Sequence, residues 1–447
     1  MTAARTLAEF AADLEYDQIP PAVVERAKAC IIDTIAASIF GAALPWSRIV
    51  IDYVLRTSAP GNACIMGTPS RVQAPLAALA NGVLALAFEL DGPVHPSVGV
   101  HPGPGCVCPG LAAAQQRGKS GRELIVAFVA GFEAMHRLGD AAPQSSEKLG
   151  FHAPGLFGTF GGALTAGRLY GLNAEQMTNA IGIAGSLCSG LLEFSQSGGG
   201  MVKRLHPGRA AEGGVMAAEL ASDGFSGPAA VIEGKYGFLN VYSRDASLAR
   251  VTAGLGRDWK TMDIAHKRYA CHGTAHVPVT AALTLKTRHG ITSGDIESIV
   301  LAGGDKIATH HNIPEPQEIT TAQYSAPFCV ALAFCRDPLD PAVFCAASVN
   351  DPEIRRLCRS VKVEILADNP TGNAKATRLT VRMKDGRQFV QYLESYPGMP
   401  GEPLTRADLR AKFDSLTTSM NAADADHLFT QLLHLEALDN VGRLRLH

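Results

Sequence analysis

The hydrophobic pattern of this chain changes near Leu255. Before that point, apolar residues recur at helical spacing, as Leu7, Phe10, Ala11 and Leu14 do in the first segment, and many of them are small. After it, short runs of strand-forming residues alternate with helical segments. The chain has 447 residues, which exceeds one average domain. The change of pattern therefore predicts two structural regions.

The first region is expected to be helical and the second to be α+β. Aromatic residues make up 6% of the chain and apolar residues 47%, a balance typical of closely packed helices with small residues at their contacts. We predict a mainly α protein, with an all-helical domain at residues 1–258 and a smaller α+β domain at residues 259–400. Helical periodicity returns in residues 401–447, which are expected to pack back on the helical domain.

The second region carries the clearest strand signals. Lys384-Asp385-Gly386-Arg387 is typical of the turn in a β-hairpin, and it joins two of the expected strands. The expected strands are Ser298–Ala302, Val361–Leu366, Thr377–Met383 and Gln388–Tyr392. The expected helices of this region are Val277–His289, Pro327–Phe334 and Ile354–Arg359.

Charge and apolar patterning argue against nucleic-acid and membrane partners. The chain has 40 basic and 42 acidic residues and a formal net charge of −2, so no positive surface for nucleic acid is predicted. Asn81 and Glu89 interrupt the longest apolar candidate for a membrane span, which needs about 18 residues. Residues 1–9 lack the pattern of a secretory signal. We therefore expect a cytoplasmic protein.

The stretch Gly198–Gly214 carries the densest set of ligand-binding groups, GGGMVKRLHPGRAAEGG. Three glycines precede Lys203, Arg204 and His206, and Pro207-Gly208 is expected to interrupt the chain before a helix begins. A cationic loop before a helix N-terminus suits a carboxylate ligand. The nucleotide motifs GxxxxGK[ST] and GxGxxG are absent, so a polycarboxylate is expected. The alternative is a solvated basic turn.

A second stretch, Phe88–Gly105, combines carboxylates with imidazoles in the sequence FELDGPVHPSVGVHPGPG. Its prolines and glycines predict a fixed loop. Glu89, Asp91, His95 and His101 are the groups in it, and a carboxylate beside an imidazole forms a base with its orienting partner. A metal site built from the same four side chains is the weaker alternative, because HxH and HExxH spacings are absent. Separate polar loop residues are the third possibility.

A third stretch, His266–His276, opens the second region with the sequence HKRYACHGTAH. Lys267, Arg268 and His272 form another cationic cluster that suits an anionic ligand. His276 is expected to have a structural role at the start of a helix. The alternative for the two basic residues is a solvated surface.

These stretches, taken in order, resemble the MmgE/PrpD family. The motifs are AKACIIDT at 27–34, the acidic loop ending in HPG at 101–103, VKRLHPGRAAEGG at 202–214, GFSGPAAVIEGKYGF at 224–238, KRYACHGTAH at 267–276 and AQYSAPFCVALA at 322–333. The resemblance extends over nearly the whole chain. It implies a large all-helical domain with a smaller α+β lid, a homodimer, and no metal or organic cofactor.

The resemblance also implies an enzyme that acts on small polycarboxylates, by dehydrating 2-methylcitrate, decarboxylating cis-aconitate or epimerising iminodisuccinate. Carried over by motif position, the expected catalytic residues are His101, His152 in GFHAPG, Lys203 and Lys267. The expected substrate-binding residues are Glu89, Asp91, His95, Arg204, His206, Arg268, Tyr269 and His272.

Departures from the family pattern point to one of these reactions. The usual acidic loop resembles DFDDTH, whereas this chain has ELDGPVH, with Pro93 in place of a hydroxyl residue. Phe328 stands where decarboxylase-type members tend to carry Tyr. Two hydroxyl donors are thus absent, and dehydration and decarboxylation both need well-placed acids.

We therefore expect a cofactor-independent epimerase of an iminodisuccinate-like polycarboxylate. His101 is the expected base, Lys267 or His152 returns the proton on the opposite face, and the cationic residues stabilise the anion that forms at a carbon alpha to a carboxylate. The alternatives are a hydro-lyase of the 2-methylcitrate dehydratase type or a related decarboxylase. A polycarboxylate-binding protein without catalytic activity is a further alternative.

Overall fold

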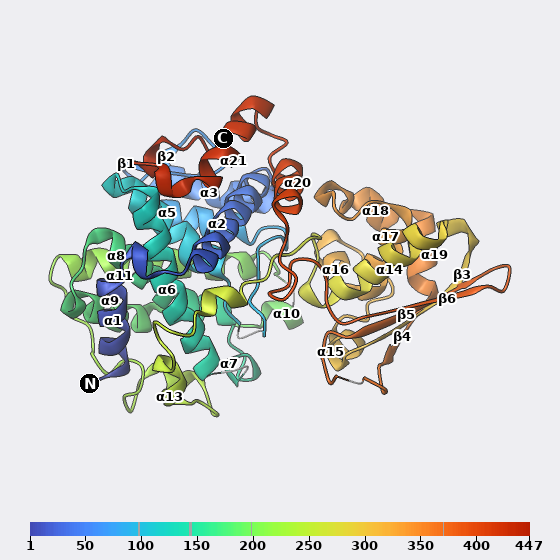
Figure 1. The fold of residues 1–447 in the computed structure, drawn as a ribbon, viewed down its shortest axis with the longest axis horizontal. Helices are drawn as coiled ribbons and strands as arrows, with labels where there is room; N and C mark the ends of the chain where they lie inside the picture. The colour runs from blue at the N-terminus through green and yellow to red at the C-terminus, as the bar shows by residue number, and fades with distance from the viewer. Residues whose placement is uncertain (97–98, 143–144, 198, 370) are drawn as a thin grey trace. The chain divides into compact units, whose positions relative to one another are not determined.

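The protein, described here by a computed structural model, divides into two compact units (Figure 1). The structure describes residues 1–96, 99–142, 145–197, 199–369 and 371–447, so Gly198 of the basic stretch and residues 97–98 of the acidic stretch lie outside the described residues. Unit 1 comprises Met1–Ala87, Asp91–His266 and Arg406–His447, and unit 2 comprises Phe88–Leu90 and Lys267–Thr405.

The boundaries between the units, at 266/267 and 405/406, lie a few residues after the predicted domain boundaries at 258/259 and 400/401. Residues 259–266 belong to unit 1 because they pair with the acidic loop, where Val94 bridges Ile264 and the Ala265 N–H donates to the Pro93 carbonyl at 2.9 Å. The segment Phe88–Leu90 belongs to unit 2, although the residues on both sides of it belong to unit 1. The helices of residues 406–447 belong to unit 1.

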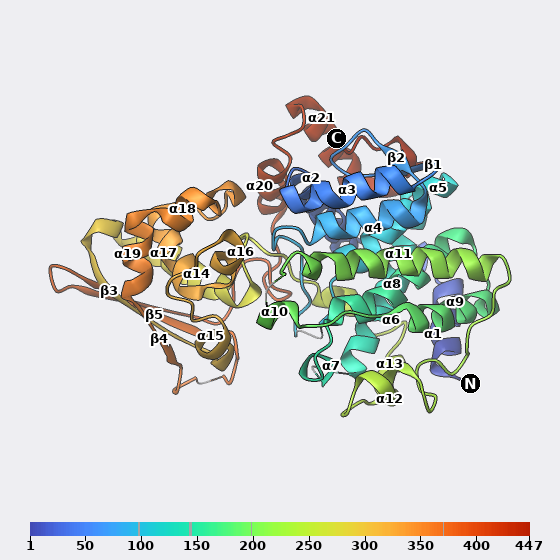
Figure 2. The ribbon, with the colours of Figure 1, turned by 180° about the vertical axis from the view of Figure 1, so that it is seen from behind.

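Unit 1 is a bundle of helices that approach one another closely through small residues. Helix α11 (Val202–Ser222) packs along α8 (Ala153–Tyr170) and α4 (Ala74–Ala85), and Figure 2 shows α4 and α11 side by side. A Cβ atom added to Gly214 would lie 2.7 Å from the backbone nitrogen of Ala163. The glycine therefore permits a backbone approach that any larger side chain would prevent.

The remaining helices of unit 1 surround this centre. They are α1 (Ala3–Asp13), α2 (Pro21–Ala42), α3 (Pro45–Thr57), α5 (Cys108–Arg117), α6 (Gly121–Ala141), α7 (Ser145–Lys148), α9 (Ala174–Leu187), α10 (Phe194–Ser197), α12 (Phe238–Tyr242), α13 (Leu248–Thr252), α20 (Arg406–Leu416) and α21 (Ala422–Leu433), with a π-helix at Gly103–Val107.

Unit 1 is not entirely helical, which corrects one part of the prediction. Strands β1 (Pro60–Cys64) and β2 (Arg71–Val72) form a small antiparallel sheet. The chain reverses between them in a turn that contains Gly67, which has φ +74°. The protein is thus mainly α, with a small sheet in unit 1 and a smaller α+β part in unit 2.

Unit 2 is built on a four-stranded sheet in the order β4-β3-β5-β6, at the four places that the sequence predicted. Strand β3 runs parallel to β4 and antiparallel to β5, and β5 pairs antiparallel with β6. The hairpin turn closes as expected, since the Met383 N–H donates to the Arg387 carbonyl at 2.8 Å and Gly386 has φ +87°. The strands are β3 (Ile296–Gly303), β4 (Val361–Ile365), β5 (Thr377–Met383) and β6 (Gln388–Leu393).

Helices cover one face of this sheet. In Figure 1, α14, α17 and α19 lie on the same side of the strands. Along β5 the side chains alternate between buried and partly exposed, as a sheet with one covered face requires. The helices of unit 2 are α14 (His276–His289), α15 (Asp305–His310), α16 (Ile319–Tyr324), α17 (Ala326–Cys335), α18 (Ala346–Asn350) and α19 (Pro352–Ser360).

Taken singly, the described helices of this protein differ in length or apolarity from helices that span a membrane. Within the described residues no single helix is long and apolar enough to cross a bilayer, and one pair, α2 and α3, passes the test together although a bend of 91° separates its members.

Candidate active site

In unit 1 the acidic loop forms a carboxylate–imidazole pair. The Asp91 Oδ2 atom hydrogen-bonds the His101 Nδ1 atom, and the Asp91 side chain is fully buried whereas that of His101 is 23% exposed. A carboxylate only accepts, so Nδ1 is the donor and Nε2 of His101 is left for proton transfer. The sequence left open whether Glu89 or Asp91 orients His101, and the structure selects Asp91.

The backbone holds His101 at the entry to a helix. The His101 carbonyl accepts the Gly105 N–H at 3.1 Å, at the start of the π-helix Gly103–Val107. Single π-turns of this kind occur often at functional sites. A Cβ atom on Gly103 would lie 2.7 Å from the Thr34 hydroxyl, so this turn packs tightly against α2. The expected loop thus ends at His101.

The basic stretch is helical, which corrects the expectation of a loop. Helix α11 begins at Val202 and includes Lys203, Arg204 and His206, with Pro207 inside it. A proline at this position removes one backbone hydrogen bond. Because α11 packs along α4 and α8, tertiary contacts outweigh that loss.

Arg204 is a structural residue in this arrangement. Its side chain donates to the carbonyls of Ala87 and Gly200, both at 2.9 Å, and its guanidinium carbon lies 4.7 Å from the centre of the Trp46 ring. Arg204 is 4% exposed. It therefore ties the start of α11 to the end of α4, and the expected role in substrate binding does not fit its surroundings. Lys203 beside it is half-buried.

Two histidines from distant parts of unit 1 meet. The Nδ1 atoms of His152 and His206 lie 3.0 Å apart, and the ring of Phe194 packs edge-on against His152 at 5.2 Å. His152 is 5% exposed and His206 is half-buried. Burial lowers the pKa of His206. The sequence singled out both residues but did not pair them.

In unit 2 the centre is a buried ion pair. The Lys267 Nζ atom lies 2.9 Å from the Glu89 Oε2 atom, and their side chains are 3% and 7% exposed. The Tyr324 hydroxyl donates to the other Glu89 oxygen at 3.2 Å. Gln323 holds the segment that contains Glu89, because its amide donates to the Phe88 carbonyl at 3.1 Å. Each member of this buried pair compensates the charge of the other, so removing either one would leave a buried charge without its partner.

Glu89 is held in an unusual backbone conformation. Among the described residues other than glycine it alone has a positive φ, at 56°. Side chains with a Cβ atom seldom adopt this region, and such strain occurs most often at functional sites. The strain places Glu89 in unit 2 beside Lys267, two positions before Asp91 in unit 1.

Tyr324 is the functional candidate that the sequence analysis missed. It lies in the motif at 322–333, four residues before Phe328. It is the one aromatic residue of that motif with a hydroxyl, and this is the feature of the sequence that points to it. Phe328 is 1% exposed and belongs to the interior of α17. Tyr324 brings a hydroxyl to Glu89, so the absence of a hydroxyl at Phe328 does not leave this region without a hydroxyl donor.

The other predicted residues of unit 2 differ in their surroundings. Tyr269 is 2% exposed, its hydroxyl lies 3.1 Å from that of Thr280, and burial raises its pKa, so it is an interior residue rather than a substrate contact. The His272 ring stacks on that of His311, with centroids 4.2 Å apart. Arg268 is half-buried.

The alternative of a metal site finds no support in the described part of the chain. No group of three or more His, Cys, Asp and Glu side chains there is arranged to hold a metal ion. Glu89 is instead paired with Lys267, and the His95 N–H donates to the Asp263 carbonyl at 2.8 Å.

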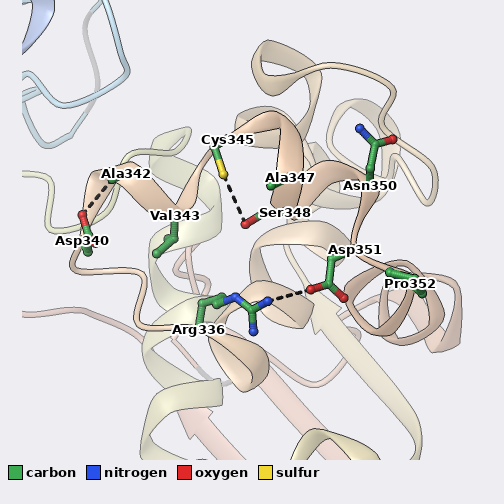
Figure 3. A pocket seen from close by; sticks show the side chains of 10 residues that line it. All are labelled: Arg336, Asp340, Ala342, Val343, Cys345, Ala347, Ser348, Asn350, Asp351 and Pro352. Atoms are coloured by element: carbon green, nitrogen blue, oxygen red, sulfur yellow. Dashed lines mark hydrogen bonds and ion pairs between the residues drawn. The ribbon is translucent and has the colours of Figure 1, made fainter.

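A surface hollow of about 540 Å³ lies elsewhere in unit 2 (Figure 3). Arg336 crosses it to bond Asp351 at 2.7 Å, and Cys345 bonds Ser348 at 3.7 Å. None of the residues that line it is a predicted site residue. Its main charged groups pair with each other, so we do not assign the substrate to this hollow.

Comparison with known proteins agrees with the motifs. The sequence profile of the MmgE/PrpD N-terminal domain matches residues 5–250, and that of the MmgE/PrpD C-terminal domain matches residues 269–435. Cis-aconitate decarboxylase of Aspergillus terreus is 31% identical over 441 residues, which cover 93% of this chain and 89% of the relative.

Mammalian relatives carry the same name. Cis-aconitate decarboxylase of Homo sapiens is 28% identical over 447 residues, covering 96% of this chain and 91% of the relative. The Mus musculus protein is 26% identical over 449 residues, covering 96% and 90%. These relatives favour the lyase alternative of the sequence analysis over the expected epimerase.

Proposed function

Because this chain belongs to the MmgE/PrpD family, we propose that it is a lyase that decarboxylates an unsaturated tricarboxylate of the cis-aconitate class. The observation that carries the proposal is the similarity to the Aspergillus terreus cis-aconitate decarboxylase over 93% of this chain. The Asp91–His101 pair supports it, because the reaction needs a group that transfers a proton.

The chemistry defines what the side chains must do. When CO2 leaves from a carbon next to a double bond, the electron pair of the broken bond spreads over three carbons and onto a remaining carboxylate. A proton then forms the new C–H bond, and the product is an unsaturated dicarboxylate. The protein must deliver that proton and bind the carboxylates that do not leave.

Two histidines in unit 1 are suited to the proton transfer, and each has a partner side chain, Asp91 for His101 and His206 for His152. His101, oriented by Asp91, is proposed as one candidate for the proton-transfer group, in place of the base that an epimerase would need. His152 is the second candidate. Lys203 is proposed to bind a carboxylate.

In unit 2, Lys267 is proposed to stabilise negative charge, with Glu89 and the Tyr324 hydroxyl holding it in place. Arg268 and His272 are proposed as substrate contacts. Action as a homodimer without a cofactor stays a prediction from the resemblance.

Epimerisation of an iminodisuccinate-like compound is the second candidate. Pro93, in place of a hydroxyl residue in the acidic loop, favours it, because a proton can be removed and returned without an acid for a leaving group. Dehydration of a 2-methylcitrate-like compound is less favoured by the same substitution.

Proton NMR of the purified protein with each of the three substrates separates these reactions. We expect cis-aconitate to give CO2 and new olefinic signals, and iminodisuccinate and 2-methylcitrate to remain unchanged. Inversion of iminodisuccinate with cis-aconitate unchanged would establish the epimerase instead.

A further inference from the structure

His152 and His206 form a pair that the fold holds in one geometry. His152 immediately precedes α8, and His206 lies in the second turn of α11. The two Nδ1 atoms are 3.0 Å apart, and the ring centroids are 5.1 Å apart with a tilt of 55°. The two rings therefore meet edge to edge through one specific nitrogen of each.

Backbone contacts fix both rings. The His152 N–H donates to the Gly190 carbonyl at 3.0 Å. Gly190 has φ +139°, and a Cβ atom there would lie 3.2 Å from the Nδ1 atom of His206. Phe194 closes the other side, with its ring 5.2 Å from that of His152 and 5.9 Å from that of His206. The loop before α10 is thus shaped around the pair.

The short separation limits the protons that the pair can hold. A nitrogen of imidazole either donates or accepts, and two facing lone pairs or two facing N–H groups repel each other. At 3.0 Å one proton lies between the two Nδ1 atoms. The pair can then carry one positive charge, with both Nε2 atoms protonated, but two charges would require a second proton on the shared axis.

We propose that His206 is a positioning residue that shares one proton with the Nδ1 atom of His152 and so orients His152, whose Nε2 atom donates a proton to substrate. The inference rests on the proposed decarboxylation. In the protonated pair, His152 gives its Nε2 proton to the carbon that receives the electron pair of the broken C–C bond. The proton between the rings stays there, the pair becomes neutral, and water restores the lost proton.

This role replaces the one that the sequence analysis gave to His206, which was a direct contact to substrate. Burial lowers the pKa of His206, which suits a ring that stays neutral and accepts from His152. The elements around the pair carry other charged and titratable groups. Those on α11 are Lys203, Arg204 and the Arg209–Glu212 ion pair. The others are His101 before the π-helix, Glu147 and Lys148 on α7, Glu193 before α10, and Tyr242 on α12.

The shared proton can be observed without any activity measurement. In the full-length protein labelled with ¹⁵N-histidine, we expect one downfield imidazole proton coupled to nitrogens of both rings. The His206→Ala variant should lose this signal, and the surface variant His427→Ala should keep it, since His427 is exposed on α21. As the pH is lowered, the pair should take up one proton in total.

The kinetic arm separates positioning from substrate binding. His206→Ala should lower kcat for CO2 release by about 10- to 100-fold while KM stays within a factor of about two. His206→Asn should restore most of kcat, because an amide can donate or accept near the position of Nδ1 but does not titrate. A direct ligand of substrate would instead show a raised KM in both variants.

The outcomes decide the inference separately from the proposed function. Uptake of two protons by the pair, or signals that couple to one ring each, overturns the shared proton. A raised KM with unchanged kcat in His206→Asn overturns the positioning role. If cis-aconitate gives no CO2 but the shared proton is present, the proposed function fails while the proton-sharing pair stands.

Discussion

Glu89 and Asp91 are separated by one residue, yet they belong to different units and have different partners. Asp91 in unit 1 hydrogen-bonds His101, an imidazole that can donate or accept a proton, whereas Glu89 in unit 2 forms an ion pair with Lys267. The first pair is suited to moving a proton and the second to holding a charge. The comparison shows that the partner, and not the carboxylate, determines the chemistry of each group.

The largest expected effect comes from removing His101, a candidate for the proton-transfer group. His101→Ala should lower kcat for CO2 release from cis-aconitate by about 10²- to 10⁴-fold, the contribution of a positioned acid or base. Steady-state kinetics at saturating substrate measures it, with His427→Ala as the surface control. Turnover at the parent rate would remove His101 from the mechanism.

Breaking the ion pair of unit 2 should lower the stability of the protein in addition to its activity. Lys267→Met leaves the buried Glu89 carboxylate without its partner, and we expect a loss of about 3–5 kcal/mol in the free energy of unfolding. The double variant Lys267→Met with Glu89→Gln should recover part of it. Chemical denaturation measures both.

A matched control for this prediction is the exposed pair Lys362–Glu364, whose side chains are 74% and 44% exposed. Lys362→Met should leave the unfolding midpoint unchanged, because solvent screens that pair. Equal losses from both substitutions would show that burial does not distinguish the Lys267 pair.

Asp91 should affect the rate through His101. Asp91→Asn removes the charge that stabilises the protonated imidazole, and we expect kcat to fall by about 10- to 100-fold with little change in KM. A raised KM with unchanged kcat would mean that Asp91 contacts substrate directly, and the contrast with Glu89 would then disappear.

The smallest effect is expected at the hydroxyl beside Glu89. Tyr324→Phe removes one hydrogen bond to a charged group, and because Tyr324 is half-buried we expect a loss of about 1.5 kcal/mol in the free energy of unfolding. Phe328→Tyr should not raise activity, since residue 328 is an interior position. Higher activity in Phe328→Tyr would restore the argument from the missing hydroxyl.

Local patterns predicted the elements better than the site. The four strands and the hairpin at residues 384–387 follow from alternation and turn residues, which act over a few positions. The sequence predicts a loop around Lys203, because Pro207-Gly208 usually interrupts a helix. The helix forms here because α11 packs along its neighbours, which local patterns do not show.

Pairings across the chain could not be predicted. Glu89 and Lys267 are 178 positions apart, and His152 and His206 are 54 apart. Only the tertiary fold brings such residues together. Local patterns do not show which side chains are buried, so the sequence predicts Arg204 as a substrate contact although its donors bond to backbone carbonyls.

The most direct test of the decarboxylase account is to count CO2 and deuterium together. The parent protein and His101→Ala are incubated with cis-aconitate in D2O, and released CO2 and the C–D bonds of the product are quantified. The account predicts one CO2 and one new C–D bond per product molecule, with both nearly lost in His101→Ala. Deuterium in recovered cis-aconitate without release of CO2 would contradict it.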